Sequence, residues 1–371
     1  VHCAALNAGA AIRTWGQSDV KMTMSNGSSI SDCFGVTNGG IISLNGSGST
    51  LDMTNSSIAK CYAMNGGSGF VMILGSSVFT LGEGASITGT LGAYNTAAVC
   101  ARGGAKFVLD GGTISGNTGD NIGGLYIYAD SSVELNRGTI SNNTAYYDGY
   151  EYCEGIYSNA PIVVNEAVTV TNNVCCKKNL TNNGTINGDV TVTGVLTNNG
   201  TITGTVTLYI PAGANPNDYF KNTGTHTGDL IVYYTVTDDY PYVLNLYYNG
   251  GTDQVGWSGS GHLKWGPNNA ETMEVTLADI TNAVTVTKYG YTFAGWYYDE
   301  ELTQPVTDPI TLTAKTAECL YAAWEKNRAE INYMAVTQNY GKQAAVSTSG
   351  GTVSGSETVD AMAEAVSGSA I

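Results

Sequence analysis

The sequence is poor in charged residues and in histidine, and each shortage narrows what the protein can be. Asp, Glu, Lys and Arg together make up 12% of the 371 residues, and only three residues are histidine. So few histidines leave little material for acid–base catalysis. The eight cysteines form no Cys-x-x-Cys pair, which argues against zinc and iron–sulfur sites. No segment approaches the roughly 18 consecutive apolar residues that cross a bilayer, so we expect no membrane insertion.

The few charges present are mostly acidic, and the formal net charge is −16. An acidic surface repels the phosphates of nucleic acids and of anionic lipids, so we expect neither as a partner. The abundant residues are Gly, Thr, Asn and Tyr, a composition typical of short β-strands joined by turns. We therefore predict an all-β protein.

A short phrase recurs along the first half of the chain, with an apolar anchor between two small residues. The steps between successive anchors are 28, 29, 27, 26 and 30 residues. A period of this length indicates an array whose units bury their apolar faces on one another. The anchors are Ile30, Ile58, Ile87, Ile114, Ile140 and Val170.

Each repeat contains three runs of alternating apolar residues with glycines at the corners, which predicts three short strands per repeat. This pattern favours a right-handed parallel β-helix over residues 1–210. From Leu180 the period falls to 16, because the phrase Thr-Asn-Asn-Gly-Thr-Ile returns at that spacing, so the helix should taper towards its C-terminal end. Residues 211–244 should cap or connect it, since an uncovered last strand would expose a reactive edge.

Positions that keep a fixed distance from the anchors should stack from coil to coil. Three residues after the anchors, cysteines give way to asparagines, which predicts stacked thiols followed by a ladder of hydrogen-bonded amides. The thiols could pair as a disulfide or remain a buried column of small apolar groups. Five residues before the anchors lies a column of core residues, which Leu81 and Val164 join with a one-residue slip. The structural positions after the anchors are Cys33, Cys61, Asn117, Asn143 and Asn173.

The phrases Gly-Thr-Ile-Ser-Gly-Asn and Gly-Gly-Leu-Tyr resemble the repeats of pectin-lyase-like β-helix surface proteins, which include bacterial adhesins. This resemblance covers about residues 20–175. It implies a β-helix on a secreted or cell-surface protein.

Residues 245–326 resemble a Listeria–Bacteroides repeat of the internalin B type, mainly through the string Gly-Tyr-Thr-Phe-Ala-Gly-Trp that ends at Trp296. The resemblance implies a small β-grasp-like module that serves as a spacer or adhesion unit on extracellular bacterial proteins. An insert at 252–282 departs from that pattern and leaves the loop geometry open. Large aromatic side chains would form the core of so small a module, and we expect Phe293, Trp296 and Trp324 in that role. Residues 327–371 resemble the start of a further repeat or form a disordered tail, and Val1 suggests an internal cut or a processed end.

The richest candidate site is a tyrosine cluster in the longest repeat. Tyrosine rings stack on the CH faces of sugars and nearby carboxylates accept sugar hydroxyl protons, so this cluster could bind a glycan. It could equally be ordinary surface packing at a corner of the solenoid. The candidate residues are Tyr126, Tyr128, Tyr146, Tyr147, Asp148, Tyr150, Glu151 and Tyr152.

A second candidate is an acidic column four residues before the anchors, formed by Glu83, Asp110 and Glu166. Stacked carboxylates could bind Ca²⁺, or they could be solvated turn residues. A polysaccharide lyase would place such carboxylates beside a base, and a glycoside hydrolase would hold two of them roughly 5–9.5 Å apart. Arg137 beside Asp110 and Glu134 is the nearest match to either arrangement.

These observations favour a non-catalytic, monomeric surface protein that is secreted or attached to the cell wall, as in Gram-positive bacteria. Its β-helix would act as a rigid rod that presents a recognition surface to a glycan or to a host or environmental protein. No cofactor is expected apart from the Ca²⁺ considered above. The alternatives are a polysaccharide lyase or glycoside hydrolase on the same scaffold, and a spacer that binds nothing.

Overall fold

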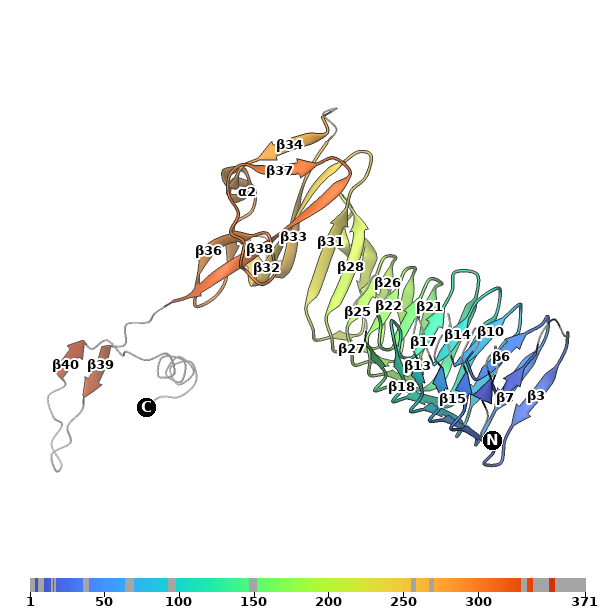
Figure 1. Cartoon of the computed structure of the whole chain (residues 1–371). Coiled ribbons are helices and arrows are strands. Elements are labelled where there is room, and N and C mark those ends of the chain that lie inside the picture. The colour runs from blue at the N-terminus through green and yellow to red at the C-terminus, as the bar shows by residue number, and fades with distance from the viewer. Residues whose placement is uncertain are drawn as a thin grey trace, which may run out of the picture.

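The computed structural model describes residues 4–5, 10–14, 16, 18–35, 40–63, 70–92, 98–146, 152–254, 258–266, 270–327, 332–335 and 347–350. Strands make up 57% of the structure and helices 4%, which confirms the all-β prediction. A right-handed β-helix occupies the N-terminal part of the chain, and a smaller domain follows it (Figure 1).

Three parallel sheets, which we call A, B and C, form the sides of the β-helix. The six strands of sheet A are β1 (Ala4–Ala5), β5 (Phe34–Gly35), β9 (Tyr62–Ala63), β13 (Leu91–Gly92), β16 (Thr118–Gly119) and β19 (Thr144–Ala145). The ten strands of sheet B are β2 (Ile12–Arg13), β6 (Ile42–Asn45), β10 (Val71–Leu74), β14 (Val99–Ala101), β17 (Leu125–Ile127), β20 (Ile156–Ser158), β22 (Val174–Cys176), β25 (Val190–Val192), β28 (Val206–Pro211) and β31 (Leu230–Thr235).

Sheet C is the longest of the three and carries the predicted anchors. Its strands are β3 (Lys21–Met24), β4 (Ser29–Ser31), β7 (Thr50–Met53), β8 (Ser57–Ala59), β11 (Val78–Gly82), β12 (Ser86–Thr88), β15 (Lys106–Ser115), β18 (Ser132–Ser141), β21 (Ile162–Val170), β23 (Leu180–Asn182), β24 (Thr185–Ile186), β26 (Leu196–Asn198), β27 (Thr201–Ile202), β29 (Phe220–Asn222) and β30 (Thr225–His226).

The predicted anchor column exists and is buried. Each anchor is the register partner of the next, from Ile30 through to Val170, and none is more than 4% exposed. The column continues through Ile186 and Ile202 and ends at His226. Stacking like side chains from coil to coil removes their apolar area from water at every step, which is the main stabilising term of such an array.

The core column before the anchors also follows the predicted register, including its one-residue slip. Leu81 pairs with Met53 on one side and Leu109 on the other, and Leu135 pairs with Val164. The slip arises from register shifts after Leu81, after Leu109 and after Leu135, where one strand carries a residue more than its neighbour.

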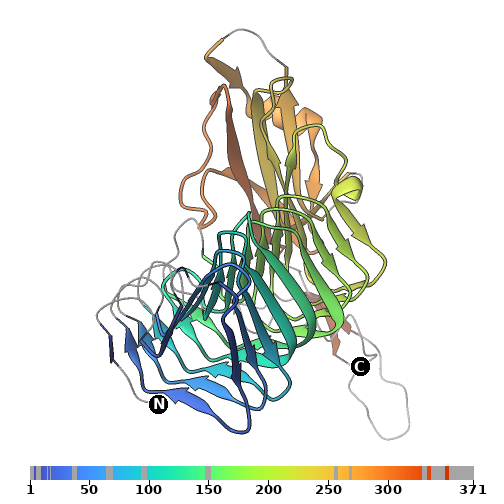
Figure 2. The ribbon, with the colours of Figure 1, turned by 90° about the vertical axis from the view of Figure 1, so that its right-hand side faces the viewer.

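The β-helix has a loop-rich part and a compact part. We call residues 10–173 the wide coils and residues 174–235 the narrow coils. The narrow coils repeat with the shorter period, because Leu180 pairs with Leu196 and Val190 with Val206, which confirms the predicted taper. Sheet A ends at β19, so within the described residues no strand of the narrow coils belongs to sheet A. Figure 2 shows the taper along the solenoid.

The β-helix continues beyond the predicted boundary at residue 210. Strands β29, β30 and β31 pair in parallel with β26, β27 and β28, so residues 220–235 form one more coil rather than a separate cap. The extra residues of this coil contain the short helix α1 (Pro216–Tyr219), which Asn215 caps through its side chain. Sequence reasoning missed this coil because the step from Leu196 to its partner Phe220 is longer than the step from Leu180 to Leu196.

The smaller domain is a mixed sheet with one helix packed against it, as in a β-grasp arrangement. Strand β32 (Tyr242–Asp253) lies parallel to β38 (Thr316–Lys326) in the middle of the sheet. Helix α2 (Leu277–Ala283) buries Ile280 in the shared core. The remaining elements are β33 (Ser258–Trp265), β34 (Thr272–Val275), β35 (Val286–Thr287), β36 (Tyr291–Tyr297) and β37 (Ile310–Thr313), and after them a two-stranded hairpin of β39 (Asn332–Ala335) and β40 (Ser347–Gly350).

Side chains of the smaller domain close the edge of the last coil. The Asn245 amide accepts from the Tyr234 N–H (2.9 Å) and donates to its carbonyl (3.2 Å). The Ser260 hydroxyl accepts from the Val232 N–H (2.9 Å) and donates to its carbonyl (3.1 Å). The two side chains replace the backbone of a further strand at Val232 and Tyr234, so this part of the β31 edge is satisfied.

Candidate functional site

The corner after the anchors carries a ladder of buried side chains. The Asn117 side-chain amide accepts from Thr90 Oγ1 (2.8 Å) and donates to Asn143 Oδ1 (3.0 Å). The next rung is Asn172, whose Oδ1 accepts from the Asn143 backbone N–H (2.9 Å), and not Asn173 as predicted. Asn117 and Asn143 stand three residues after their anchors, whereas Asn172 stands two residues after Val170. The corner after Val170 is one residue shorter because sheet A has ended at β19. The amides of this ladder are buried, so they can support a neighbouring surface but cannot themselves contact a ligand.

The two cysteines of this corner are stacked thiols. Cys33 and Cys61 are buried, and their Sγ atoms donate to the carbonyls of Ser31 (3.4 Å) and Ala59 (3.3 Å). Burial raises the pKa of Cys61 to about 11. Of the two alternatives left open by the sequence, the structure shows the thiol column.

A packed cluster covers the outer face of sheet B on the wide coils. The middle residues of β14, β17, β20 and β22 are register partners and point away from the solenoid core. Ile122 and Cys153, which form a parallel bridge, cover them. We call this set the outer cluster, and its members are Cys100, Ile122, Tyr126, Cys153 and Tyr157, with Tyr128 and Cys175 at its margin.

The outer cluster takes Tyr126 out of the predicted ligand site. Tyr126 is 4% exposed, and its ring stacks on Tyr128 (centroids 4.4 Å apart) and meets Tyr157 edge-on (5.3 Å). The prediction that Tyr126 presents a ring to a ligand is therefore wrong, because the ring is buried against Tyr128 and Tyr157. Tyr126 instead supports Tyr128, which is half-buried at the margin.

In the longest coil, Tyr152 and Glu154 flank the outer-cluster residue Cys153, and Tyr146 ends the described segment before them. Tyr146 is 74% exposed, and Tyr152 is half-buried with its hydroxyl donating to Glu154 Oε1 (3.1 Å). Glu154 Oε2 accepts from the side chain of the ladder residue Asn172 (3.5 Å). We call Tyr128, Tyr146, Tyr152 and Glu154 the rim. The predicted residues Tyr147, Asp148, Tyr150 and Glu151 lie outside the described residues.

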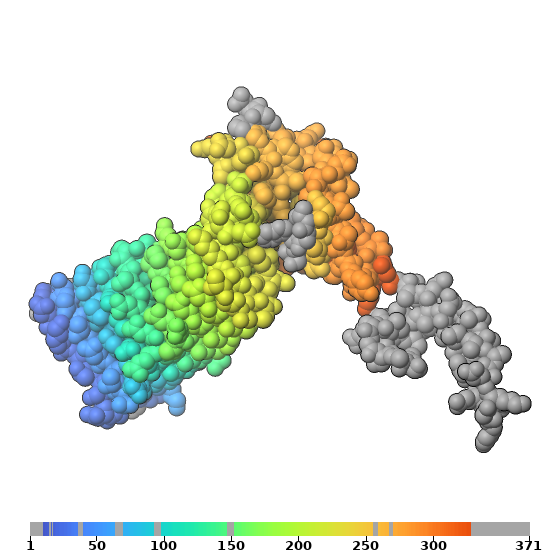
Figure 3. All heavy atoms as spheres, turned by 180° about the vertical axis from the view of Figure 1, so that it is seen from behind, coloured from blue at the N-terminus to red at the C-terminus, as the bar shows by residue number. Residues whose placement is uncertain are grey.

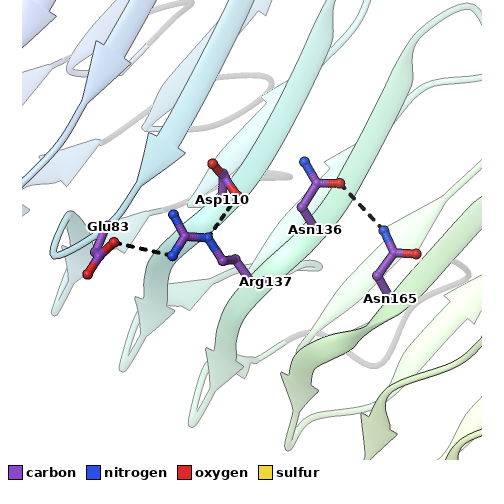
Figure 4. A network of polar contacts seen from close by, with 5 residues as sticks. All are labelled: Glu83, Asp110, Asn136, Arg137 and Asn165. Carbon is purple, nitrogen blue, oxygen red and sulfur yellow. Dashed lines mark hydrogen bonds and ion pairs between the residues drawn. The ribbon is translucent and has the colours of Figure 1, made fainter.

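The acidic column lies on the outer face of sheet C, where an arginine engages it. Arg137 Nε donates to Asp110 Oδ1 (3.0 Å), and an NH1 donates to Glu83 Oε2 (3.2 Å), as Figure 4 shows. All three side chains are at least 43% exposed, so water screens the network. The hydrogen bonds to Asp110 and then Glu83 raise the pKa of Arg137, which keeps the guanidinium charged and unable to act as a base.

The other members of the acidic column do not join this network. Glu166 is exposed on β21, where Asn165 instead donates to Asn136 (3.5 Å). Glu134 is not part of this column; it was expected beside Arg137, but it pairs with Lys106 (2.6 Å), and Glu83 takes its place at the arginine. Among the described residues, no group of three or more His, Cys, Asp or Glu side chains lies close enough to hold a metal ion. A Ca²⁺ site on the acidic column therefore stays a prediction.

The smaller domain contains a pocket of about 310 Å³ that sequence reasoning missed. It lies between α2 and β36, beside a bulge at Gly295 where β36 shifts register. Phe293, predicted to be core, is 37% exposed at this pocket, because its ring meets Trp296 and Trp324 edge-on without a covering layer. Trp296 is buried, and Trp324 Nε1 donates to the Tyr248 carbonyl (2.7 Å). The pocket is lined by Leu277, Thr281, Phe293, Ala294, Gly295, Trp296, Tyr297, Pro305 and Val306.

Comparison of the chain with known protein families, with curated proteins and with solved structures gave no match. Of the sites considered, the rim alone combines an exposed aromatic ring, a half-buried phenol and a carboxylate held by hydrogen bonds on a packed support.

Proposed function

We propose that this protein recognises a glycan, or a glycan-bearing or other protein surface, through the rim of the longest coil, without catalysing a reaction. The observation that carries the proposal is the rim itself. An exposed Tyr146 ring offers a stacking face, while Glu154 offers carboxylate oxygens to sugar hydroxyls. A binding group that is fixed before the ligand arrives loses less conformational entropy on binding.

The support beneath the rim explains why the β-helix suits this role. Tyr152 and Glu154 flank Cys153, which is fully buried in the outer cluster, and Glu154 is tied to the amide ladder through Asn172. The rim is thus joined to the outer cluster and to the amide ladder. Figure 3 shows the coils of the solenoid packed into one continuous body. A single tyrosine–sugar contact is weak, so recognition would draw on several such contacts along the rod.

The alternative of a polysaccharide lyase or glycoside hydrolase lacks a comparable site among the described residues. Its nearest constellation, Arg137 with Asp110 and Glu83, is an exposed set of ion pairs on a strand face. A general base needs a pKa near the working pH, and the pKa of Arg137 is raised above an already high value. We therefore place catalysis second.

We further propose that the protein acts outside the cell, secreted or attached to the wall. Support comes from the resemblance of both parts of the chain to bacterial surface modules. In the described part of the chain no helix is long and apolar enough to span a bilayer. The proposal needs neither a cofactor nor an oligomer.

Binding of the whole chain to a broad glycan array, followed by titration against the strongest ligand, tests this function. The double variant Tyr146→Ala/Tyr152→Ala should weaken binding at least about tenfold, the effect of losing one or two aromatic contacts. Thr191→Ala is the matched control, because Thr191 occupies the same outer face of sheet B on a narrow coil. It should bind like the unaltered protein.

The same assay distinguishes the alternatives. Equal binding by the double variant and the control would reject the rim as the site. Release of unsaturated or shortened oligosaccharides from an array ligand would favour the enzyme. Absence of binding to glycans and to surface proteins would leave only the spacer role.

A further inference from the structure

Two thiols of the outer cluster lie against each other's backbone. Cys153 Sγ donates to the Asn173 carbonyl (3.4 Å), two residues before Cys175. Cys175 Sγ donates to the Tyr152 carbonyl (3.6 Å), directly before Cys153. These reciprocal contacts bring together two segments that are well separated in the sequence.

The geometry also decides which of the vicinal cysteines can reach Cys153. Successive side chains of a strand point to opposite faces, so Cys175 and Cys176 diverge. Cys176 is 1% exposed inside the solenoid, and its thiol donates to the carbonyls of Ala160 and Asn179 (both 3.6 Å). Cys175 is half-buried at the outer cluster.

We propose that Cys153 and Cys175 form a disulfide that fastens the rim residues Tyr152 and Glu154 to strand β22. The oxidant is a small disulfide such as glutathione disulfide. The Cys175 thiolate attacks one sulfur of that molecule, so a Cys175–glutathione bond forms and one glutathione thiolate leaves. Cys153 then gives its proton to water and attacks the Cys175 sulfur, and the second glutathione leaves. Two protein thiols are oxidised and one glutathione disulfide becomes two glutathiones.

The surroundings favour this order of attack. Cys175 is the more accessible thiol, and its pKa is lowered by the hydrogen bond from Cys153 and by the charge of Lys177. Cys153 is fully buried, and burial raises its pKa. The stacked thiols Cys33 and Cys61 are both buried, so oxidant reaches them more slowly. The inference does not depend on the proposed glycan-binding role.

Peptide mapping of the whole chain tests the disulfide directly. The protein is exposed to glutathione disulfide, blocked with N-ethylmaleimide in denaturant, and digested without reductant. Trypsin alone is insufficient, because no Lys or Arg lies between Arg137 and Lys177. A second, glutamate-specific protease cuts after Glu151, Glu154 and Glu166, which separates the peptides 152–154 and 167–177. We expect these two peptides to be joined, and to separate on reduction.

Serine variants identify the pairing partner. Cys175→Ser should abolish the joined peptide, whereas Cys176→Ser, the matched control, should retain it. In the unaltered protein, two fewer of the eight cysteines should react with N-ethylmaleimide after oxidation than before it. Three results would overturn the proposal: unlinked peptides in the unaltered protein, glutathione retained on Cys175, or a link that survives Cys175→Ser. The first two need no variant, so they stand even if a variant fails to fold.

Discussion

The wide and narrow coils share one anchor column but differ in everything attached to it. Ile114 and Ile186 stand in the same column and are both fully buried. On the outer face of sheet B, however, the wide coils carry Tyr126 and Tyr157 beneath covering residues. The narrow coils carry Thr191 and Thr207 there, and after them the stacked pair Tyr209 and Tyr233. The comparison teaches that the short turn of the narrow coils suffices to continue the solenoid. The additional residues of the longest wide coil include three of the four rim residues, Tyr146, Tyr152 and Glu154.

The narrow coils have their own internal ladder. Asn198 accepts from the Asn182 amide and donates to Asn222, both at 2.8 Å, and Asn182 and Asn198 are fully buried. A wide coil uses one ladder at the corner after the anchors, and a narrow coil uses another before them. The polar support of the rod therefore changes position where sheet A ends.

The largest expected effect is common to both parts. Ile114→Ala in a wide coil and Ile186→Ala in a narrow coil should each cost about 4 kcal/mol, through lost burial and the cavity left behind. Chemical unfolding measures both. A difference of several kcal/mol between the two variants would show that the anchors do not act as one column.

A close backbone contact in a narrow coil should have the next largest effect. Gly200 lies in a tight corner of a narrow coil, where a Cβ would stand 2.1 Å from the Gly184 carbonyl oxygen. Gly200→Ala should therefore destabilise the protein by about 3 kcal/mol, because backbone must move. Gly116→Asn is the wide-coil control, since its corner is open to 4.0 Å and its φ of +63° suits asparagine. Equal losses of thermal stability in Gly200→Ala and Gly116→Asn would contradict a special role for the close contact at Gly200.

The two ladders should contribute similarly. Asn143→Ala removes one of the two acceptors of the buried Asn117 amide, which keeps only the Ile87 carbonyl. Asn198→Ala likewise leaves the Asn182 amide with only the Thr201 carbonyl. Each should cost about 2 kcal/mol, the penalty for an unsatisfied buried group. Asn183→Ala, which affects an exposed amide pair with Asn199, serves as the control and should be nearly neutral. Unchanged stability in Asn143→Ala would show that the ladder does not stabilise the protein.

The smallest effect is expected on the outer face of sheet C. Arg137→Ala removes the contacts with Asp110 and Glu83, all of them exposed. Thermal melting should change little, and less still at high salt, because water and ions already screen these charges. A large loss of stability, or of ligand binding, would mean that this face does more than we assign to it.

The repetitive part of the fold could be predicted from the sequence, because strand stacking imposes a fixed period on Ile87, Ile114 and Ile140. The slip at Leu81 was visible for the same reason. The shift from Asn173 to Asn172 could not be predicted, since it depends on where sheet A ends.

Predictions of exposure fared worse than predictions of register. Alternation places Tyr126 on the outer face but does not say that Ile122 and Cys153 cover it. The exposure of Phe293 depends on where α2 packs, which no local pattern encodes. The sequence phrase around Asn182 and Asn198 repeats visibly, yet only the structure shows that these amides bond to each other.

Excision of single coils tests most directly whether the wide coils carry recognition and the narrow coils only extend the rod. Deleting residues 181–196 removes one narrow turn and joins Leu180 to Thr197, which preserves the register. Deleting residues 141–170 removes one wide turn with Tyr146, Tyr152 and Glu154, and joins Ile140 to Thr171. Circular dichroism should first show that both proteins are folded. Affinity for the array ligand should then be unchanged in the narrow-turn deletion and lost in the wide-turn deletion. Lost affinity in the first, or full affinity in the second, would contradict the account.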